Sequence, residues 1–162
     1  MERFWRSSFG TLPWTTSTSE TTQSLVASPA DASVSVSELN QRVAQTLWTR
    51  FPDPIWVRGE LASFDKSSGK RHAHFELVEK SPGLDEVLSR MAAVLFDTQR
   101  TVLEEKLAAQ ADPLLLRDGL MVRLRGRIGL YAPQGRLQLI VDDIDPSYSL
   151  GQLALRKQEI LL

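Results

Sequence analysis

Two adjacent segments with a two-residue repeat of apolar side chains constrain the fold of this chain more than any other feature. They are Leu120–Tyr131 and Gly135–Ile144, joined by Ala132-Pro133-Gln134-Gly135. Such a repeat is typical of β-strands with one face in a core, and a short connection containing Pro and Gly is typical of a hairpin. We therefore predict a β-hairpin here. The residues expected to face inward on its first strand are Val122, Leu124, Ile128 and Leu130.

Three earlier segments carry similar strand patterns. We predict strands over Ile55–Phe64, Arg71–Glu79 and Met91–Phe96, with a loop over Lys80–Arg90 between the last two. Alternation of side chains along the first strand separates an inner from an outer face. We expect Trp56, Arg58, Glu60 and Phe64 on one face, and Val57, Leu61 and Ser63 on the other.

Apolar residues at helical spacing predict helices over Ser37–Arg50, before the strands, and Thr98–Gln110, after the third strand. The expected protein is therefore mainly β with flanking helices. A five-stranded barrel with a helix between its third and fourth strands is the OB-fold arrangement. Gly126 and Gly129 interrupt the fourth strand, as suits a strand that bends to close a small barrel or that has no room for a side chain.

The chain divides into three parts by composition. Residues 1–33 include thirteen Ser or Thr and no apolar repeat, which predicts a disordered tail. Residues 34–148 are expected to form the OB-fold domain, and residues 149–162 to begin a linker helix. The absence of cysteine excludes disulfides and suits a reducing cytoplasm. No apolar run approaches the roughly 20 residues of a membrane helix, so we expect a cytoplasmic protein without a membrane partner.

The outer face of the predicted fourth strand carries a row of basic side chains. Arg123, Arg125 and Arg127 alternate with inward-facing residues, and Tyr131 follows on the same face. Adjacent guanidinium groups repel one another, and a phosphate backbone would relieve that repulsion while releasing counterions. The alternative is a solvated surface neutralised by acidic neighbours, because Asp142 and Asp143 lie nearby in sequence.

A second group of candidate binding residues lies at the predicted second strand. His72 and His74 are expected on its outer face, beside Lys70 and Arg71. Imidazole rings stack on bases, and cations follow a phosphate backbone between them. The two histidines could instead be an inert surface pair or ligate a metal ion. The chain has no third His and no Cys, so we expect no metal site.

Catalytic motifs are missing from the sequence. It contains no Cys, no Ser in a nucleophile-elbow pattern and no Gly-rich phosphate loop of the nucleotide-binding kinds. From the residues alone, the chain is expected to bind a partner without a cofactor and without catalysis.

A set of short motifs follows in order over about 120 residues. The motifs are Val36-Ser-Glu-Leu-Asn40, the segment 55–64, Ser67-Ser-Gly69, His72-Ala-His-Phe-Glu-Leu77, Ala93-Val-Leu-Phe96, the segment 119–127, Leu130-Tyr-Ala-Pro-Gln-Gly135, Leu137-Gln-Leu-Ile-Val141 and Gly151-Gln-Leu153. In this order they resemble the exodeoxyribonuclease VII large subunit. The resemblance implies an N-terminal OB domain that binds single-stranded DNA for a nuclease that degrades DNA to oligonucleotides.

In that family the catalytic domain follows the barrel, and a later helical region gathers small subunits. The resemblance therefore implies that this chain alone is inactive. It also implies that small subunits bind only if the C-terminal part is present or is supplied by another chain. The alternatives are a stand-alone OB-fold module for protein interaction or for RNA binding, because OB folds host many functions.

Overall fold

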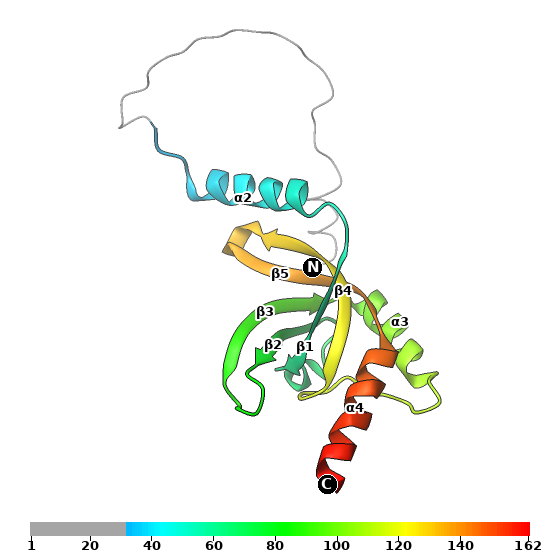
Figure 1. Ribbon diagram of the computed structural model, residues 1–162. Coiled ribbons are helices and arrows are strands. Elements are labelled where there is room, and N and C mark those ends of the chain that lie inside the picture. Colours follow the sequence, from blue (N-terminus) through cyan, green and yellow to red (C-terminus); the bar gives the residue numbers. More distant parts are fainter. Residues whose placement is uncertain (1–31) are drawn as a thin grey trace. The chain divides into compact units, whose positions relative to one another are not determined.

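The computed structural model describes residues 32–162 (Figure 1). Our prediction of a disordered tail falls almost entirely on residues outside this range. The helices are α2 (Val36–Arg50), α3 (Asp97–Ala108) and α4 (Pro146–Leu161). The strands are β1 (Ile55–Ala62), β2 (Ala73–Lys80), β3 (Val87–Leu95), β4 (Met121–Tyr131) and β5 (Arg136–Ile144). Within residues 32–162, no helix is long and apolar enough to cross a membrane.

The five strands form one closed barrel in the order β1-β2-β3-β5-β4. Its neighbours pair antiparallel except β3 and β5, which run parallel. The connection from β3 to β4 contains α3. This is the OB-fold arrangement, so the predicted mainly β fold with a helix between the third and fourth strands is confirmed.

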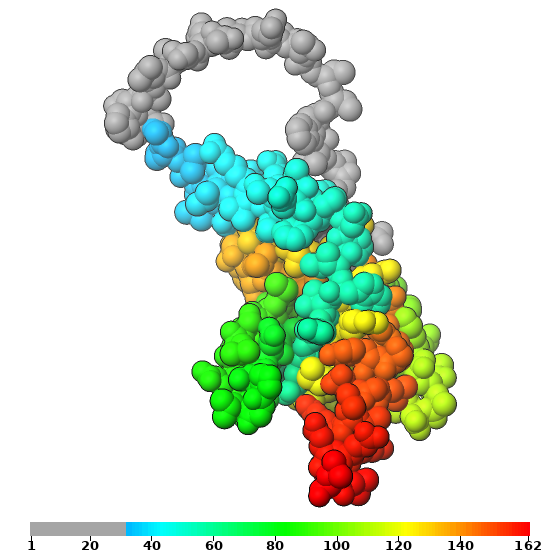
Figure 2. Space-filling view, viewed as in Figure 1, coloured from blue at the N-terminus to red at the C-terminus, as the bar shows by residue number. Residues whose placement is uncertain are grey.

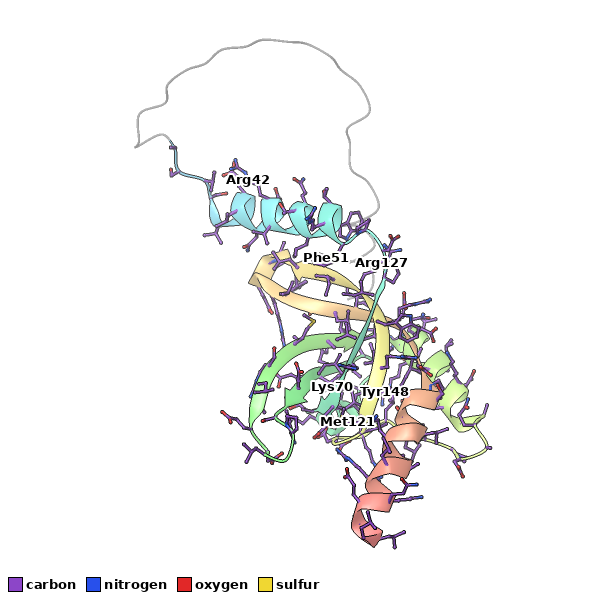
Figure 3. All side chains as sticks on the ribbon, viewed as in Figure 1. Arg42, Phe51, Lys70, Met121, Arg127 and Tyr148 are labelled. Carbon is purple, nitrogen blue, oxygen red and sulfur yellow. The ribbon has the colours of Figure 1, made fainter. Side chains whose placement is uncertain are left out.

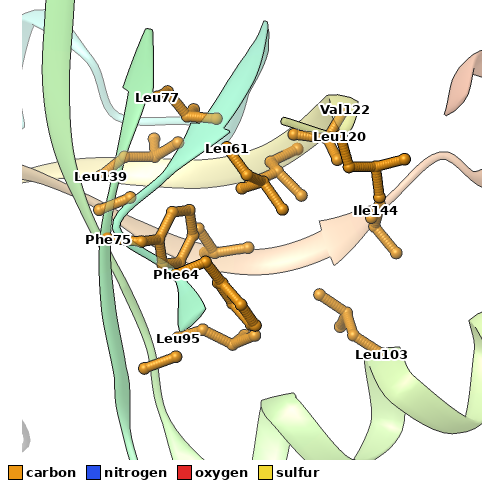
Figure 4. Packing of buried hydrophobic residues seen from close by; sticks show 14 of the residues in the cluster. Leu61, Phe64, Phe75, Leu77, Leu95, Leu103, Leu120, Val122, Leu139 and Ile144 are labelled. Atoms are coloured by element: carbon orange, nitrogen blue, oxygen red, sulfur yellow. The ribbon is translucent and has the colours of Figure 1, made fainter. Parts of the chain in front are cut away.

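The core lies inside the barrel and is closed at one end by α3 (Figure 4). Ala73, Phe75 and Leu77 reach it from β2 with exposures of 0 to 4%. The four predicted inward residues of β4 are likewise buried. Leu103 and Leu107 of α3 are buried against the same cluster, as their spacing predicts.

Our placement of Phe64 on the same face as Trp56, Arg58 and Glu60 was wrong. Phe64 is only 3% exposed, and its ring meets that of Phe75 edge-on with centroids 5.3 Å apart. The reason is local: β1 ends at Ala62, and Ser63 has a positive φ of 60° that breaks the side-chain alternation. Phe64 therefore turns back into the core.

The predicted loop over Lys80–Arg90 was also too long. β3 already begins at Val87, and the Ser81 N–H closes the turn by donating to the Glu86 carbonyl at 2.9 Å. The first four residues of β3 are exposed, so no burial pattern marks them as a strand. Backbone pairing with β2 holds them instead, for example between Glu79 and Ser89.

Helix α2 rests on the connection between β4 and β5 (Figures 1 and 2). The Asn40 amide donates to the Ala132 carbonyl at 2.8 Å, and a side chain at Gly135 would touch Asn40. Gly135 has φ 59°, a conformation that glycine adopts without strain. The predicted hairpin connection is thus confirmed, and α2 is fixed to it.

Candidate nucleic-acid interface

The outward side chains of β4 do not form a single surface. From Arg123 to Tyr131 a strand rises roughly 26 Å, at about 3.3 Å per residue. The pairing of β4 with β5 also shifts register between Arg125 and Gly126. Arg123 and Arg125 lie opposite β1, whereas Tyr131 lies opposite Arg136 of β5. The predicted row is therefore divided between two places.

We call the first place the β1–β4 face. It consists of Trp56, Arg58, Arg123, Arg125 and Tyr148. In the strand pairing, Arg58 lies opposite Arg123 and Trp56 opposite Arg125. The Cζ atoms of Arg123 and Arg125 both lie 5.8 Å from the Trp56 ring centroid, and Arg123 lies 5.7 Å from that of Tyr148. Guanidinium groups and aromatic rings thus alternate across this face.

Two arginines of the β1–β4 face have acidic partners. Arg125 pairs with Asp142 at 2.7 Å, and Arg123 pairs with Asp145. Hydrogen bonds from Ser147 and Arg123 lower the pKa of Asp145. The repulsion that we inferred among the arginines is therefore largely neutralised, as the alternative interpretation foresaw for Asp142. Within residues 32–162, Arg58 forms no ion pair.

Arg127 does not belong to the β1–β4 face, and its guanidinium group contacts the backbone instead. It donates to the Pro52 carbonyl at 2.7 Å, which ties the connection between α2 and β1 to the barrel. Figure 3 shows it near Phe51, at the end of α2.

We call the second place the loop surface. It consists of Lys70, Arg71, His72, His74, Tyr131 and Arg136. It combines the β1–β2 loop with the strand ends beside the β4–β5 connection. In OB folds generally, these two loops and the face of strands 2 and 3 bind oligonucleotides.

The charge of Arg136 acts on His74, at the start of β2. Partial burial lowers the pKa of His74, and the positive charges of Arg136, His72 and Lys70 lower it further. Sequence reasoning missed Arg136. The predicted hairpin would have found it, because Arg136 is the cross-strand partner of Tyr131.

Arg71 and His72 are engaged with the start of α3. Arg71 pairs with Asp97 at 3.0 Å, and the Asp97 backbone N–H donates to His72 Nδ1 at 3.0 Å. The His72 ring also meets Phe96 edge-on. β2 begins at Ala73, so His72 lies in the preceding loop and not on the strand where we expected it. In the part of the chain that the structure describes, Lys70 and Arg136 have no ion pair.

No cluster of three or more His, Cys, Asp or Glu side chains with the geometry of a metal site occurs within residues 32–162. His72 and His74 lie on different sides of the start of β2, and His72 Nδ1 already accepts a hydrogen bond. The described site therefore consists of cations and flat rings.

The family model described as an OB-fold nucleic acid binding domain matches residues 34–145. Among curated proteins, the exodeoxyribonuclease 7 large subunit of Deinococcus radiodurans is 32% identical over 132 residues, which are 79% of this chain and 30% of that protein. The protein of the same name from Pseudomonas aeruginosa strain LESB58 is 34% identical over 123 residues, 76% of this chain and 22% of that protein. The chain thus spans less than a third of the length of these relatives.

Among solved structures, a mitochondrial single-stranded DNA binding protein from S. cerevisiae covers 59% of this chain and 93% of its own. Its identity is 12% and its TM-score 0.36, so this likeness adds nothing to the assignment. The family model, in contrast, spans more than half of the sequence and coincides with the barrel. This chain belongs to the family of OB-fold nucleic-acid-binding domains, and it resembles the exodeoxyribonuclease VII large subunit.

Proposed function

We propose that this domain binds single-stranded DNA across the loop surface. The observation that carries the proposal is that the charges of Lys70, in the β1–β2 loop, and of Arg136, at the start of β5, both act on His74 and lower its pKa. Neither cation has an acidic partner within residues 32–162, so both charges are available to phosphate. Three cationic or imidazole groups gathered without a counter-charge favour an anionic ligand.

Each side chain of the loop surface has a role in binding that follows from its chemistry. Lys70 and Arg136 neutralise phosphates, and the accessible ring of His74 stacks on a base. The lowered pKa of His74 keeps this ring neutral at neutral pH. Arg71 and His72 act mainly as supports, because Asp97 holds both of them. Tyr131 extends the surface beside Arg136.

DNA is our choice of ligand because the curated relatives are named as exodeoxyribonuclease subunits. RNA differs in its 2′-hydroxyl, which these residue types do not exclude. Protein interaction is the other alternative, and it predicts no affinity for either polymer. Both alternatives are outcomes of the following experiment.

The test is fluorescence anisotropy with labelled single-stranded DNA, single-stranded RNA and duplex DNA over a range of salt concentrations. We expect single-stranded DNA to bind most tightly. The K70A/R136A double variant should bind more weakly, with a salt slope reduced by about 0.7 for each lost phosphate contact. R117A is the matched control, because Arg117 is exposed and lies outside both surfaces. Equal binding by the double variant would refute the loop surface, and no binding by the wild type would refute the function.

We further propose that this domain is the DNA-binding part of a nuclease. The catalytic residues of that nuclease would lie outside this chain. Small subunits would then be partners only through the part that lies outside this chain. A cytoplasmic location, which the lack of cysteine suits, is likewise a prediction. Incubating the purified chain with single-stranded DNA and a divalent cation tests the first point, and degradation of the DNA would contradict it.

A further inference from the structure

Trp56 is a large aromatic side chain that the core does not use. It is 47% exposed, although it lies on a paired strand, as the second residue of β1. Its immediate neighbours on the β1–β4 face are cations. Arg125 lies opposite it, and Arg123 lies diagonally across. An exposed tryptophan ring leaves a large apolar surface in water, and a ligand that covers the ring gains the free energy of burying it.

The flanking guanidinium groups orient the ring in advance. Both Cζ atoms lie at 5.8 Å from the ring centroid, within the range of a cation–π contact. Asp142 and Asp145 in turn hold these guanidinium groups. The ring is therefore partly immobilised before a ligand arrives, which reduces the entropy lost on binding.

A free positive charge lies beside this ring. Arg58 is two residues along β1 on the same face, is exposed, and has no ion pair within residues 32–162. A flat exposed ring next to an unpaired cation matches the base and phosphate of one nucleotide. Neutralisation by the two aspartates leaves Arg58 as the main charge that a phosphate would meet.

We propose that the β1–β4 face is a second contact for single-stranded DNA, in which a base stacks on Trp56 and a phosphate meets Arg58. This proposal rests on the proposed function, and extends it from the loop surface to the other end of β4. Arg123 and Arg125 position the ring.

Binding to the loop surface and the β1–β4 face together requires a longer DNA strand than binding to the loop surface alone. Arg125 and Tyr131 are six residues apart on one strand, roughly 20 Å. At the axial rise of about 3.4 Å per nucleotide in one strand of B-DNA, that distance corresponds to roughly six nucleotides. Joining both surfaces therefore takes a strand of at least about six nucleotides, which lies within the range of about 4 to 16 nucleotides known for OB folds.

The experiment compares oligothymidylates of about 5 and about 15 nucleotides, binding to the wild type and to W56A. For the longer strand we expect W56A to lose roughly 5- to 150-fold in affinity, the effect of one stacked base, and W56F to lose less. For the shorter strand, held at the loop surface, we expect little change. R58A should lower the salt slope for the longer strand by about 0.7, and K157A, an exposed lysine of α4, should not.

Fluorescence gives a readout that a purely structural role would not move. The sequence has four tryptophans, and replacing Trp5, Trp14 and Trp48 with Phe leaves Trp56 as the only emitter. We expect the longer strand to quench this emission. The matched control retains only Trp48, on α2, and should show no quenching.

The outcomes separate this proposal from the proposed function. If the wild type binds neither strand, the function itself fails. If the wild type binds both strands but W56A binds the longer one equally well and Trp56 emission is unchanged, then only the second contact is wrong. In that case the arrangement of Trp56 with Arg123 and Tyr148 is a structural brace for α4.

Discussion

Arg123 on β4 donates to Asp145, the residue whose carboxylate also caps the first turn of α4. The same carboxylate accepts from the Ser147 backbone N–H at 3.0 Å. One side chain thus fixes the start of α4 to the barrel wall. Because Tyr148 lies against Arg123 as well, the direction of the helix depends on this corner of the β1–β4 face.

The first prediction concerns the cap of α4. D145A should reduce the free energy of unfolding by about 1 kcal/mol, the usual cost of losing an N-cap. D145N should lose less, because an amide oxygen still caps the helix. Urea unfolding measures both variants, and equal stability of D145A and the wild type would show that the cap contributes nothing.

This corner also predicts a pH dependence. The folded-state pKa of Asp145 is lowered from 3.8, chiefly by the hydrogen bond from Ser147. Its stabilising contribution is therefore present above pH 3.8 and is lost as pH falls through the lower, folded value. Unfolding of D145A should accordingly depend less on pH in this acidic window than unfolding of the wild type. If the free energies of unfolding of D145A and the wild type depend on pH in the same way, Asp145 is not the source of this pH dependence.

The second prediction tests a close backbone approach in β4. A Cβ atom at Gly126 would lie 2.4 Å from the Ile140 carbonyl oxygen, so G126A should cost about 1 to 3 kcal/mol. Gly151 is the matched control within α4, where a Cβ atom would meet nothing within 4 Å. G151A should stabilise the protein by roughly 0.5 to 1 kcal/mol. Chemical unfolding should show a lower free energy of unfolding for G126A and a higher one for G151A. A change in the same direction for both variants would argue against the close contact.

The third prediction contrasts two aromatic residues that the sequence pattern placed on one face. F64A should cost about 3 to 5 kcal/mol, since it removes a ring from the core. W56A should cost about 1 kcal/mol or less, because its half-exposed ring lies outside the core and loses mainly cation–π contacts. Thermal unfolding measures the stability of both variants. A larger loss of stability in W56A than in F64A would contradict the burial of Phe64 in the core and the position of Trp56 outside it.

These two residues also show where sequence reasoning succeeds and where it stops. The two-residue repeat correctly predicted the inner face of β4, because regular pairing preserves it. It failed at Phe64, since a single backbone angle at Ser63 inverted the pattern. It also missed the beginning of β3, where exposed residues are held by backbone pairing alone.

The candidate site was less predictable than the fold. The basic residues were visible in the sequence, but their partners were not. Asp97 and Asp145 lie 26 and 22 residues from Arg71 and Arg123, and only the fold brings each pair together. The fold also brings Arg136 to the site, because Arg136 lies across the hairpin from Tyr131.

The fourth prediction concerns the protonation of His74. Its folded-state pKa lies below 6.5 because of partial burial and the nearby cations, chiefly Arg136. The folded state is therefore destabilised as pH falls below 6.5 and through that lower value, and H74Q should remove this part of the pH dependence. A bound phosphate would offset the repulsion, so single-stranded DNA should raise the pKa of His74. Titration of its ring protons by NMR, with and without DNA, measures this shift, and an unchanged pKa would separate His74 from the bound strand.

Amide chemical shifts in a titration with unlabelled single-stranded DNA test the central claim most directly, because they report the contacted residues without any substitution. We expect the largest changes at Lys70–His74 and Tyr131–Arg136, the two ends of the loop surface. Changes confined to α2 or α4, or no change at all at saturating DNA, would contradict the claim that this OB-fold domain binds single-stranded DNA there.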